Sequence, residues 1–435
     1  LFWFSKKIDT SFLLPKKYKK IILLFFSFIF ISLGIRNIKL AFNGHQEKTE
    51  IIRSIKYSFS VQLRKNFPVG FILKTFQVFD GFKKKNKYLS NIKDFSFNTT
   101  KQDTLNEKEI YILVIGETAR KHNFHIYGYP RNTSPNLDSI KNLIAFNNVK
   151  SNANVTSLSI PFMLTRATPK NPELKFNEPT IINAFKEAGF KTYWLSNQQI
   201  ATGSIFRLYA QSADVYLNIS KSIDANGYDE NVLPIFDDVL KNSVRKKFII
   251  VHTIGSHFRY NYRYPEHFNY YSSNLEKGLS IENTTKYENK NEIINSYDNS
   301  IIYTDYILNN IIHKLEAKKA NSFMYYISDH GENLFDNNQK KLLHGFENPT
   351  KFEVEIPLFI WTSNEYNLNY PNKIKELHEN IENKIATVNT FYTLLDMSNI
   401  SYPDFEKNKS FADKKFDTLQ EHLFFNVNKS VIKLD

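Results

Sequence analysis

The 435-residue sequence contains no cysteine. This absence excludes a disulfide scaffold, a thiol nucleophile, a cysteine-ligated zinc site and an iron–sulfur cluster. It does not exclude an oxidising compartment, because such a compartment permits disulfides without requiring them. Glycine and proline are scarce, at 13 and 14 residues, which we attribute mainly to codon bias. The chain begins at Leu1 rather than at methionine, and we expect it to be part of a longer protein.

The net charge of +13 comes entirely from one end of the chain. Residues 1–110 hold 21 Lys/Arg against 8 Asp/Glu, and the remaining residues hold 36 of each kind. A nucleic-acid-binding protein usually carries its basic patch on the folded domain. Here the surplus surrounds an apolar segment, which favours a role at a membrane surface and no nucleic-acid partner.

That apolar segment is Ile21–Ile35, and it is short for a membrane span unless it extends toward Phe42. A buried core helix and a signal-peptide core are the alternatives. We predict a transmembrane helix at about residues 21–40, within a truncated membrane segment 1–42. Basic residues 16–20 precede it, which predicts that the rest of the chain lies outside the cytoplasm.

Residues 43–108 have a mixed amphipathic and basic pattern and predict a juxtamembrane or linker region. The sequence pattern changes at residue 109, where short apolar runs begin to alternate with helical patterns. These runs lie at 109–115, 191–196, 247–253, 322–328 and 356–361. Such alternation indicates an α/β domain over 109–435, with a mainly parallel sheet covered on both faces.

Acidic and imidazole side chains follow three of these runs. Glu117 follows the first, His257 follows the third, and Asp329 and His330 follow the fourth. Ligands of open α/β sheets bind beyond the carboxyl ends of the strands, so we expect these side chains to converge. Carboxylate oxygens and imidazole nitrogens are zinc ligands, and Thr156 is a candidate fourth ligand whose hydroxyl could act as a nucleophile.

Each of these residues also has a structural interpretation. Glu117 could be an acid in the first turn of a helix, where it meets the helix dipole. Asp329 and His330 could form a loop pair or a helix cap. Thr156 opens a predicted helix, and a threonine in that place is most often an N-cap. Their joint placement after strands favours the metal site.

An ordered set of motifs carries a resemblance to a known family. The motifs are YILVIGETAR, IYGYPRNTSPNLD, NVTSLSIPFML, TYWLSNQ, HTIGSHFRYNYRYP, SYDNSIIYTDYIL, SDHGEN, LLHGF and IPLFIW. Over residues 108–400 the chain resembles the catalytic domain of bacterial phosphoethanolamine transferases. These are membrane-anchored enzymes of the alkaline phosphatase–sulfatase superfamily, so the resemblance implies an alkaline phosphatase-like α/β/α sandwich.

The resemblance also implies roles for individual residues. Thr156 matches the nucleophile that is transiently modified by phosphoethanolamine, and it also matches a metal ligand. Glu117, Asp329 and His330 match the other ligands of one tightly bound zinc, with manganese the less favoured metal. His257 of GSH and His344 of LLHG match histidines that hold a second metal or the substrate phosphate.

The implied substrates are phosphatidylethanolamine as donor and lipopolysaccharide as acceptor. The loop after WLSNQ contains no lysine, a residue we associate with lipid-A-directed members, and WLSNQ and MLTRATP resemble members that act on the lipopolysaccharide core. The resemblance therefore puts lipid A in doubt as the acceptor, although core heptose and lipid A both stay open. The implied enzyme is a monomer in a bacterial inner membrane with a periplasmic catalytic domain. Its rivals are a phosphoglycerol transferase, a sulfatase-like hydrolase and a non-enzymatic basic membrane-surface protein. A sulfatase needs Cys or Ser in a Cys/Ser-x-Pro-x-Arg setting, which Thr156-Ser-Leu does not provide.

Overall fold

The computed structural model describes residues 69–434, with short gaps at 104, 106, 199, 201–203 and 221–226. The transmembrane helix predicted at residues 21–40 therefore lies outside the described residues. Within the described part, no helix is both long enough and apolar enough to span a bilayer. The chain divides into two compact units, Leu1–Lys83 and Lys84–Asp435. The helix α3 (Val69–Ile92) contains the boundary, and the second unit carries the fold discussed below.

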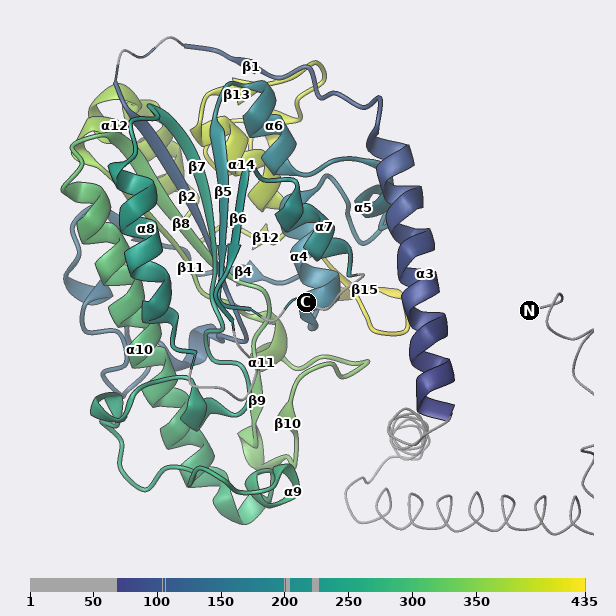
Figure 1. The fold of residues 1–435 in the computed structure, drawn as a ribbon. Coiled ribbons are helices and arrows are strands. Elements are labelled where there is room, and N and C mark those ends of the chain that lie inside the picture. Colours follow the sequence, from purple (N-terminus) through teal and green to yellow (C-terminus); the bar gives the residue numbers. More distant parts are fainter. Residues whose placement is uncertain are drawn as a thin grey trace, which may run out of the picture. The chain divides into compact units, whose positions relative to one another are not determined.

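A seven-stranded sheet forms the centre of the second unit (Figure 1). In spatial order its strands are β3 (Leu143–Ala145), β11 (Leu358–Thr362), β8 (Asn321–Ser328), β2 (Glu109–Gly116), β7 (Lys246–His252), β5 (Lys191–Ser196) and β6 (Val215–Asn218). All five apolar runs are strands of this sheet, as the sequence predicts. The two short strands at its edges, β3 and β6, have no counterpart among those runs.

The sheet is mainly parallel, as expected, but β11 runs antiparallel to β8 and β3. The connection between β8 and β11 explains this direction. It contains the short strands β9 (Asn333–Leu334) and β10 (Leu342–Leu343) and the four-residue helix α11 (Lys351–Val354). Parallel pairing requires a long crossover, usually a helix, and this connection has no helix of that length.

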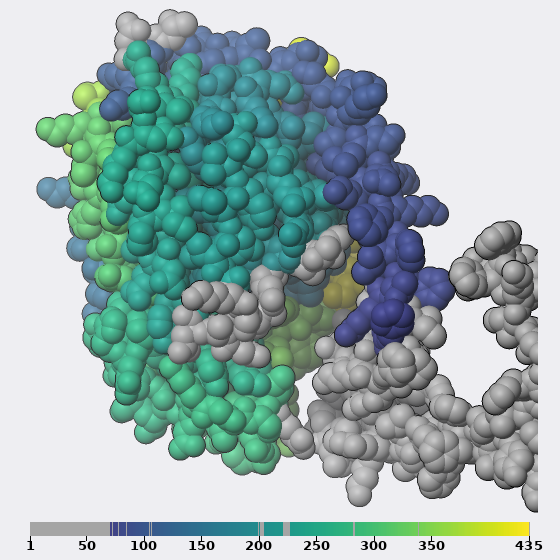
Figure 2. Space-filling view, in the orientation of Figure 1, coloured from purple at the N-terminus to yellow at the C-terminus, as the bar shows by residue number. Residues whose placement is uncertain are grey.

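Helices cover both faces of the sheet (Figure 1). One face packs against α4 (Thr156–Leu164), α6 (Ile181–Glu187), α7 (Ile205–Gln211) and α14 (Asn389–Met397). The other packs against α8 (Val232–Lys241) and the long α10 (Lys290–Glu316). The expected α/β/α sandwich is therefore present. Figure 2 shows the molecule from the same side, where the teal and green segments form a continuous surface.

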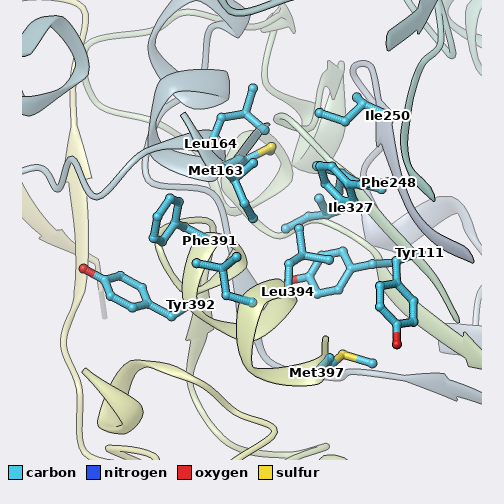
Figure 3. Close-up of a cluster of buried hydrophobic side chains, with 14 of the residues drawn as sticks. Tyr111, Met163, Leu164, Phe248, Ile250, Ile327, Phe391, Tyr392, Leu394 and Met397 are labelled. Atoms are coloured by element: carbon cyan, nitrogen blue, oxygen red, sulfur yellow. The ribbon is translucent and has the colours of Figure 1, made fainter. Parts of the chain in front are cut away.

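The alternating side chains of β2 show why both faces need cover. Tyr111 and Leu113 belong to one hydrophobic cluster, whereas Ile112 and Val114 belong to the other. Figure 3 shows part of the first cluster, where side chains from β2, β7 and β8 meet α4 and α14. Removing one large apolar side chain from water contributes about 1.5–3 kcal/mol. The packed sheet is thus a rigid platform for whatever its strand ends carry.

Smaller elements complete the second unit. They are α5 (Leu174–Asn177), α9 (Ile281–Thr284), α12 (Asn364–Asn369), α13 (Pro371–Glu379) and four two-stranded pairs. The pairs join β1 (Thr100–Lys101) to β13 (Ile400–Ser401), β9 to β10, β4 (Val149–Lys150) to β12 (Ile385–Ala386), and β14 (His422–Phe425) to β15 (Val431–Leu434). The β9–β10 pair leads directly to His344, which follows β10.

Candidate metal centre

Three neighbouring parallel strands bring their carboxyl ends to one place. Strand β2 lies between β7 and β8, and Gly116 at its end pairs with Ser328. Glu117, Asp329 and His330 follow directly, and all three are buried. One ligand atom from each lies within 4.8 Å of the other two. The convergence expected for these residues is therefore found.

The backbone around Glu117 is tightly packed. Gly255, in the loop after β7, has φ +48°, and a Cβ there would lie 2.8 Å from the Glu117 carbonyl oxygen. The next residue, Ser256, donates its N–H to that oxygen at 3.0 Å. Glycine is required at this close approach because an added side chain would push the loop away from Glu117.

Thr118 links the two carboxylates. Its backbone N–H donates to Asp329 Oδ1 at 2.9 Å, and its hydroxyl donates to Glu117 Oε1 at 2.8 Å. Thr118 has φ +59°, a left-handed conformation that is unfavourable for a β-branched residue. Strained backbone of this kind persists where the surroundings enforce it, and it is concentrated at functional sites.

The other oxygens of the two carboxylates differ in their partners. Glu117 Oε2 accepts a hydrogen bond from Gln198 Nε2 at 2.9 Å. Asp329 Oδ1 also accepts from the His330 N–H at 2.8 Å. Asp329 Oδ2, although buried, accepts no hydrogen bond from the described residues. A buried carboxylate oxygen without a donor is an atom that a cation would satisfy.

The ring of His330 is oriented for coordination. Its Nδ1 lies 2.9 Å from the carbonyl oxygen of Gly331, which can only accept, so Nδ1 carries the proton. The lone pair is then on Nε2, which lies 3.3 Å from Asp329 Oδ2 and 3.6 Å from Glu117 Oε1. Burial holds the pKa of His330 well below its usual value, so the ring is neutral. A neutral imidazole with a free Nε2 is the form that binds metals.

The electrostatics of the carboxylates point to the same chemistry. Burial raises the pKa of both Glu117 and Asp329, and the charge of Asp329 adds to the rise at Glu117. Two buried carboxylates facing each other are unfavourable unless positive charge lies between them. Glu117, Asp329 and His330 offer two oxygens and one nitrogen, a donor set that suits zinc. The residues therefore fit a divalent metal.

Thr156 lies beside this cluster. Its hydroxyl is 3.2 Å and 3.4 Å from the two oxygens of Glu117 and 3.4 Å from His330 Nε2. It is the first residue of α4, whose N-cap is Val155, and no side chain caps this helix end. The N-cap interpretation of Thr156 is thus wrong, because its hydroxyl faces the cluster instead of the helix N–H groups. Thr156 is also partly exposed, so a substrate could reach it.

His344 and His257 are the two other histidines predicted for the site. The His344 ring lies 4.0 Å from the His330 ring, centre to centre, and its Nδ1 is 3.1 Å from Glu332 Oε1. Burial opposes protonation, but the nearby carboxylates, Glu332 first, raise the pKa of His344 to about 9. His257 is partly buried, and its Nδ1 lies 2.5 Å from the carbonyl oxygen of Phe258. Burial lowers the pKa of His257, so its unprotonated Nε2 is an acceptor.

The first-turn interpretation of Glu117 and the helix-cap interpretation of Asp329 and His330 are also wrong, whereas a loop pair agrees with the position of Asp329 and His330 after β8. Glu117 lies in a bend after β2 and not in the first turn of a helix, and Asp329 and His330 cap no helix. Our sequence analysis missed Thr118, Gln198 and Glu332, which bond to candidate site residues. The only signal for them is that each stands inside a quoted motif, GETAR, WLSNQ and SDHGEN respectively.

Comparison with known proteins identifies the protein family to which this chain belongs. The chain belongs to the sulfatase family, whose model matches residues 109–400. Within that class, the chain is similar to phosphoethanolamine transferase EptC of Escherichia coli, with 34% identity over 328 residues. This match covers 73% of the chain and 55% of the relative. Phosphoethanolamine transferase CptA of Salmonella typhimurium is 32% identical over 317 residues, covering 70% and 53%.

The chain spans about half the length of these curated relatives. A solved structure accounts for most of the folded part. The C-terminal periplasmic domain of Escherichia coli EptC, in complex with Zn, matches with a TM-score of 0.69 and 31% identity. The match covers 77% of this chain and 95% of that domain. The chain is therefore a relative of phosphoethanolamine transferases, as the motifs indicate.

Proposed function

We propose that this chain is the catalytic part of a zinc-dependent transferase that moves phosphoethanolamine from phosphatidylethanolamine to lipopolysaccharide. One observation carries the proposal. The Thr156 hydroxyl lies at the N-terminus of α4, within 3.2 Å of a carboxylate that belongs to a buried two-oxygen, one-nitrogen cluster. A cation site and a helix N-terminus both stabilise a phosphoryl group, so a hydroxyl beside them is suited to phosphoryl transfer.

In this proposal Glu117, Asp329 and His330 hold the zinc, and Thr156 is its fourth ligand. A bound zinc supplies positive charge that favours the deprotonated hydroxyl and the charge on the transferring group. The Thr156 hydroxyl is aimed by its contacts with Glu117 and His330. A second metal, or the substrate phosphate itself, would lie toward His257 and His344.

The reaction then proceeds in two balanced steps. Thr156 Oγ1 loses its proton and forms a bond to phosphorus, while the bond from phosphorus to the diacylglycerol oxygen breaks. In this proposal His344, whose pKa is raised by Glu332, protonates that leaving oxygen. An acceptor hydroxyl, whose proton returns to His344, then attacks the same phosphorus, and Thr156 Oγ1 leaves and takes back from water the proton that it had released there. Threonine at position 156 supports this route over that of a sulfatase, which requires a modified Cys or Ser.

The location follows from the substrates. We propose a bacterial inner-membrane protein with a periplasmic catalytic domain, anchored by the apolar segment near residues 21–40. Whether the acceptor is the core heptose or lipid A is a question for experiment. Mass spectrometry of lipopolysaccharide from cells with and without the gene should show loss of phosphoethanolamine from one part of the molecule. The wild-type gene should restore the group and a Thr156→Ala gene should not, whereas an unchanged lipopolysaccharide would refute the acceptor.

A further inference from the structure

Glu353 is a buried carboxylate that binds three segments around the candidate site. It lies in α11, and its side chain is fully buried. Its Oε1 accepts hydrogen bonds from Asn154 Nδ2 at 2.6 Å, the Gly345 N–H at 3.0 Å and the Phe346 N–H at 3.2 Å. Its Oε2 accepts from the Thr350 N–H at 2.9 Å. All four donors are neutral groups, and burial raises the pKa of the Glu353 carboxyl.

The donors to Oε1 belong to the segments that carry the reacting groups. Asn154 stands two residues before Thr156, and Gly345 directly follows His344. Asn154 Nδ2 also donates to the Phe346 carbonyl oxygen at 2.8 Å, which joins the same two segments a second time. One oxygen atom of Glu353 therefore lies between the chain that leads to the nucleophile and the chain that leads from His344.

The backbone of α11 adds the third segment. The Glu353 carbonyl oxygen accepts from the Gly331 N–H at 2.7 Å, directly after His330. The Phe352 carbonyl oxygen accepts from the Glu332 N–H at 2.9 Å. A Cβ at Gly331 would lie 2.1 Å from the Phe352 oxygen, so glycine permits this approach. The helix α11 thus lies against the same loop that holds the metal ligands.

Helix capping does not account for these contacts. Thr350 and Glu353 form a capping box, and that motif explains only the Oε2 contact. The three donors to Oε1 come from outside α11, at separations of 199, 8 and 7 residues. Burying a polar group is costly, and the capping box uses only Oε2 of the two carboxyl oxygens. The position of Oε1 therefore requires another explanation.

We propose that Glu353 is a positioning residue, whose buried carboxylate sets the placement of Thr156 relative to His344. The proposal rests on the proposed function, in which Thr156 attacks phosphorus and His344 acts on an oxygen of the same group. In such a reaction, a displacement of about 1 Å costs on the order of 10²-fold in rate. A shared anchor two residues from one group and one residue from the other limits that displacement.

Three variants of the whole 435-residue chain test the proposal. Glu353→Met keeps the approximate volume and removes both oxygens, so kcat should fall about 10- to 100-fold with zinc content unchanged. Glu353→Gln can keep an oxygen at the Oε1 position and should restore most of the rate. Glu355→Met is the matched control, because the Glu355 carboxylate pairs with His122 and its loss should leave kcat unchanged.

A double variant separates positioning from general stabilisation. Asn154→Ala removes the same hydrogen bond from the other partner, so its loss should not multiply with that of Glu353→Met. Losses that multiply in the double variant would overturn the proposal, and so would a wild-type kcat for Glu353→Met. If Glu353→Met does not fold, Asn154→Ala alone must show the loss of kcat with zinc retained.

Amide hydrogen exchange tests whether the Glu353 carboxylate holds the segment after His344, and this test does not depend on enzymatic activity. The amides of Gly345 and Phe346 donate to Glu353, so both should exchange faster in Glu353→Met than in the wild type or in Glu355→Met. Unchanged exchange would refute the anchor even if the enzyme is a transferase. Faster exchange in a chain that transfers no phosphoethanolamine would refute the proposed function and leave the anchor standing.

Discussion

The two halves of the candidate site are held by different kinds of structure. Glu117, Asp329 and His330 directly follow β2 and β8, whose positions are set by a buried, hydrogen-bonded sheet. Thr156 begins a helix and His344 follows a two-residue strand, so these two are placed by contacts between loops. In the proposed reaction, three of the four metal ligands therefore depend on one part of the fold, and the two reacting groups, Thr156 and His344, depend on another. Substitutions in the two halves should therefore fail in different ways.

The largest effect is expected in the strand-end half. Asp329→Ala removes a candidate ligand and leaves Glu117 without its partner oxygen, so zinc binding and transfer should both be lost. The control Asp238→Ala on α8 should bind zinc like the wild type, because the Asp238 side chain is 78% exposed. Elemental analysis and a transfer assay measure the two properties. Unchanged zinc content in Asp329→Ala would exclude the proposed centre.

Substitution of His344 should cause a smaller loss of activity than Asp329→Ala, and it should affect the rate and not zinc binding. His344→Gln should lower kcat on the order of 10²-fold, the scale of one lost acid–base group, and zinc should stay bound. His313→Gln is the control, since the His313 side chain is 64% exposed on α10. If His344→Gln loses as much zinc as Asp329→Ala, the division of the site into two halves is wrong.

The link between the two carboxylates should have a moderate effect on affinity. Thr118→Val keeps the shape and the N–H bond to Asp329 but removes the hydroxyl bond to Glu117. Zinc affinity should fall about 10- to 100-fold, as is typical when a partner of a metal ligand is lost. Thr118→Ser keeps the hydroxyl and should bind zinc nearly as the wild type does. Chelator competition measures both affinities, and equal values for Val and Ser would refute the role of the hydroxyl.

The smallest effect is expected at Gln198. Gln198→Met removes one hydrogen bond to Glu117 Oε2, while Glu117 Oε1 keeps its bond from Thr118. Because the carboxylate is still held at one oxygen, zinc affinity should fall no more than about 10-fold. Gln102→Met, in an exposed contact with Thr100, is the control. If Gln198→Met lowers zinc affinity more than Thr118→Val does, the Gln198 contact with Glu117 matters more than the Thr118 contact, contrary to this prediction.

The comparison also explains how far sequence alone leads. The five central strands are visible because each is a continuous apolar run, and Glu117, Asp329 and His330 follow from their positions after such runs. The edge strand β6 (Val215–Asn218) is missed because it is short and partly exposed, and its pattern gives no strong period. The antiparallel direction of β11 reflects the lack of a crossover helix between β8 and β11, and no sequence motif predicts that lack.

The contacts within the site are harder to predict than its ligands. Thr350 and Glu353 have the spacing of a capping box, so the sequence can indicate the start of a helix there. Nothing in that spacing shows that Glu353 Oε1 lies 2.6 Å from Asn154, which is 199 residues away. Hydrogen bonds between distant loops depend on the assembled fold, and they carry no local periodicity. This is why the loop half of the site needs the structure.

The central claim is that Thr156 is a nucleophile, and intact-protein mass spectrometry tests it most directly. The wild-type chain, exposed to phosphatidylethanolamine without acceptor, should gain one phosphoethanolamine on Thr156. Thr156→Ala should gain none yet stay folded and bind zinc, because its hydroxyl caps no helix and the change avoids the about 0.5–2 kcal/mol cost of a lost N-cap. Thr156→Ser should keep some adduct. A folded Thr156→Ala protein that still forms the adduct, or still transfers the group, would contradict the account.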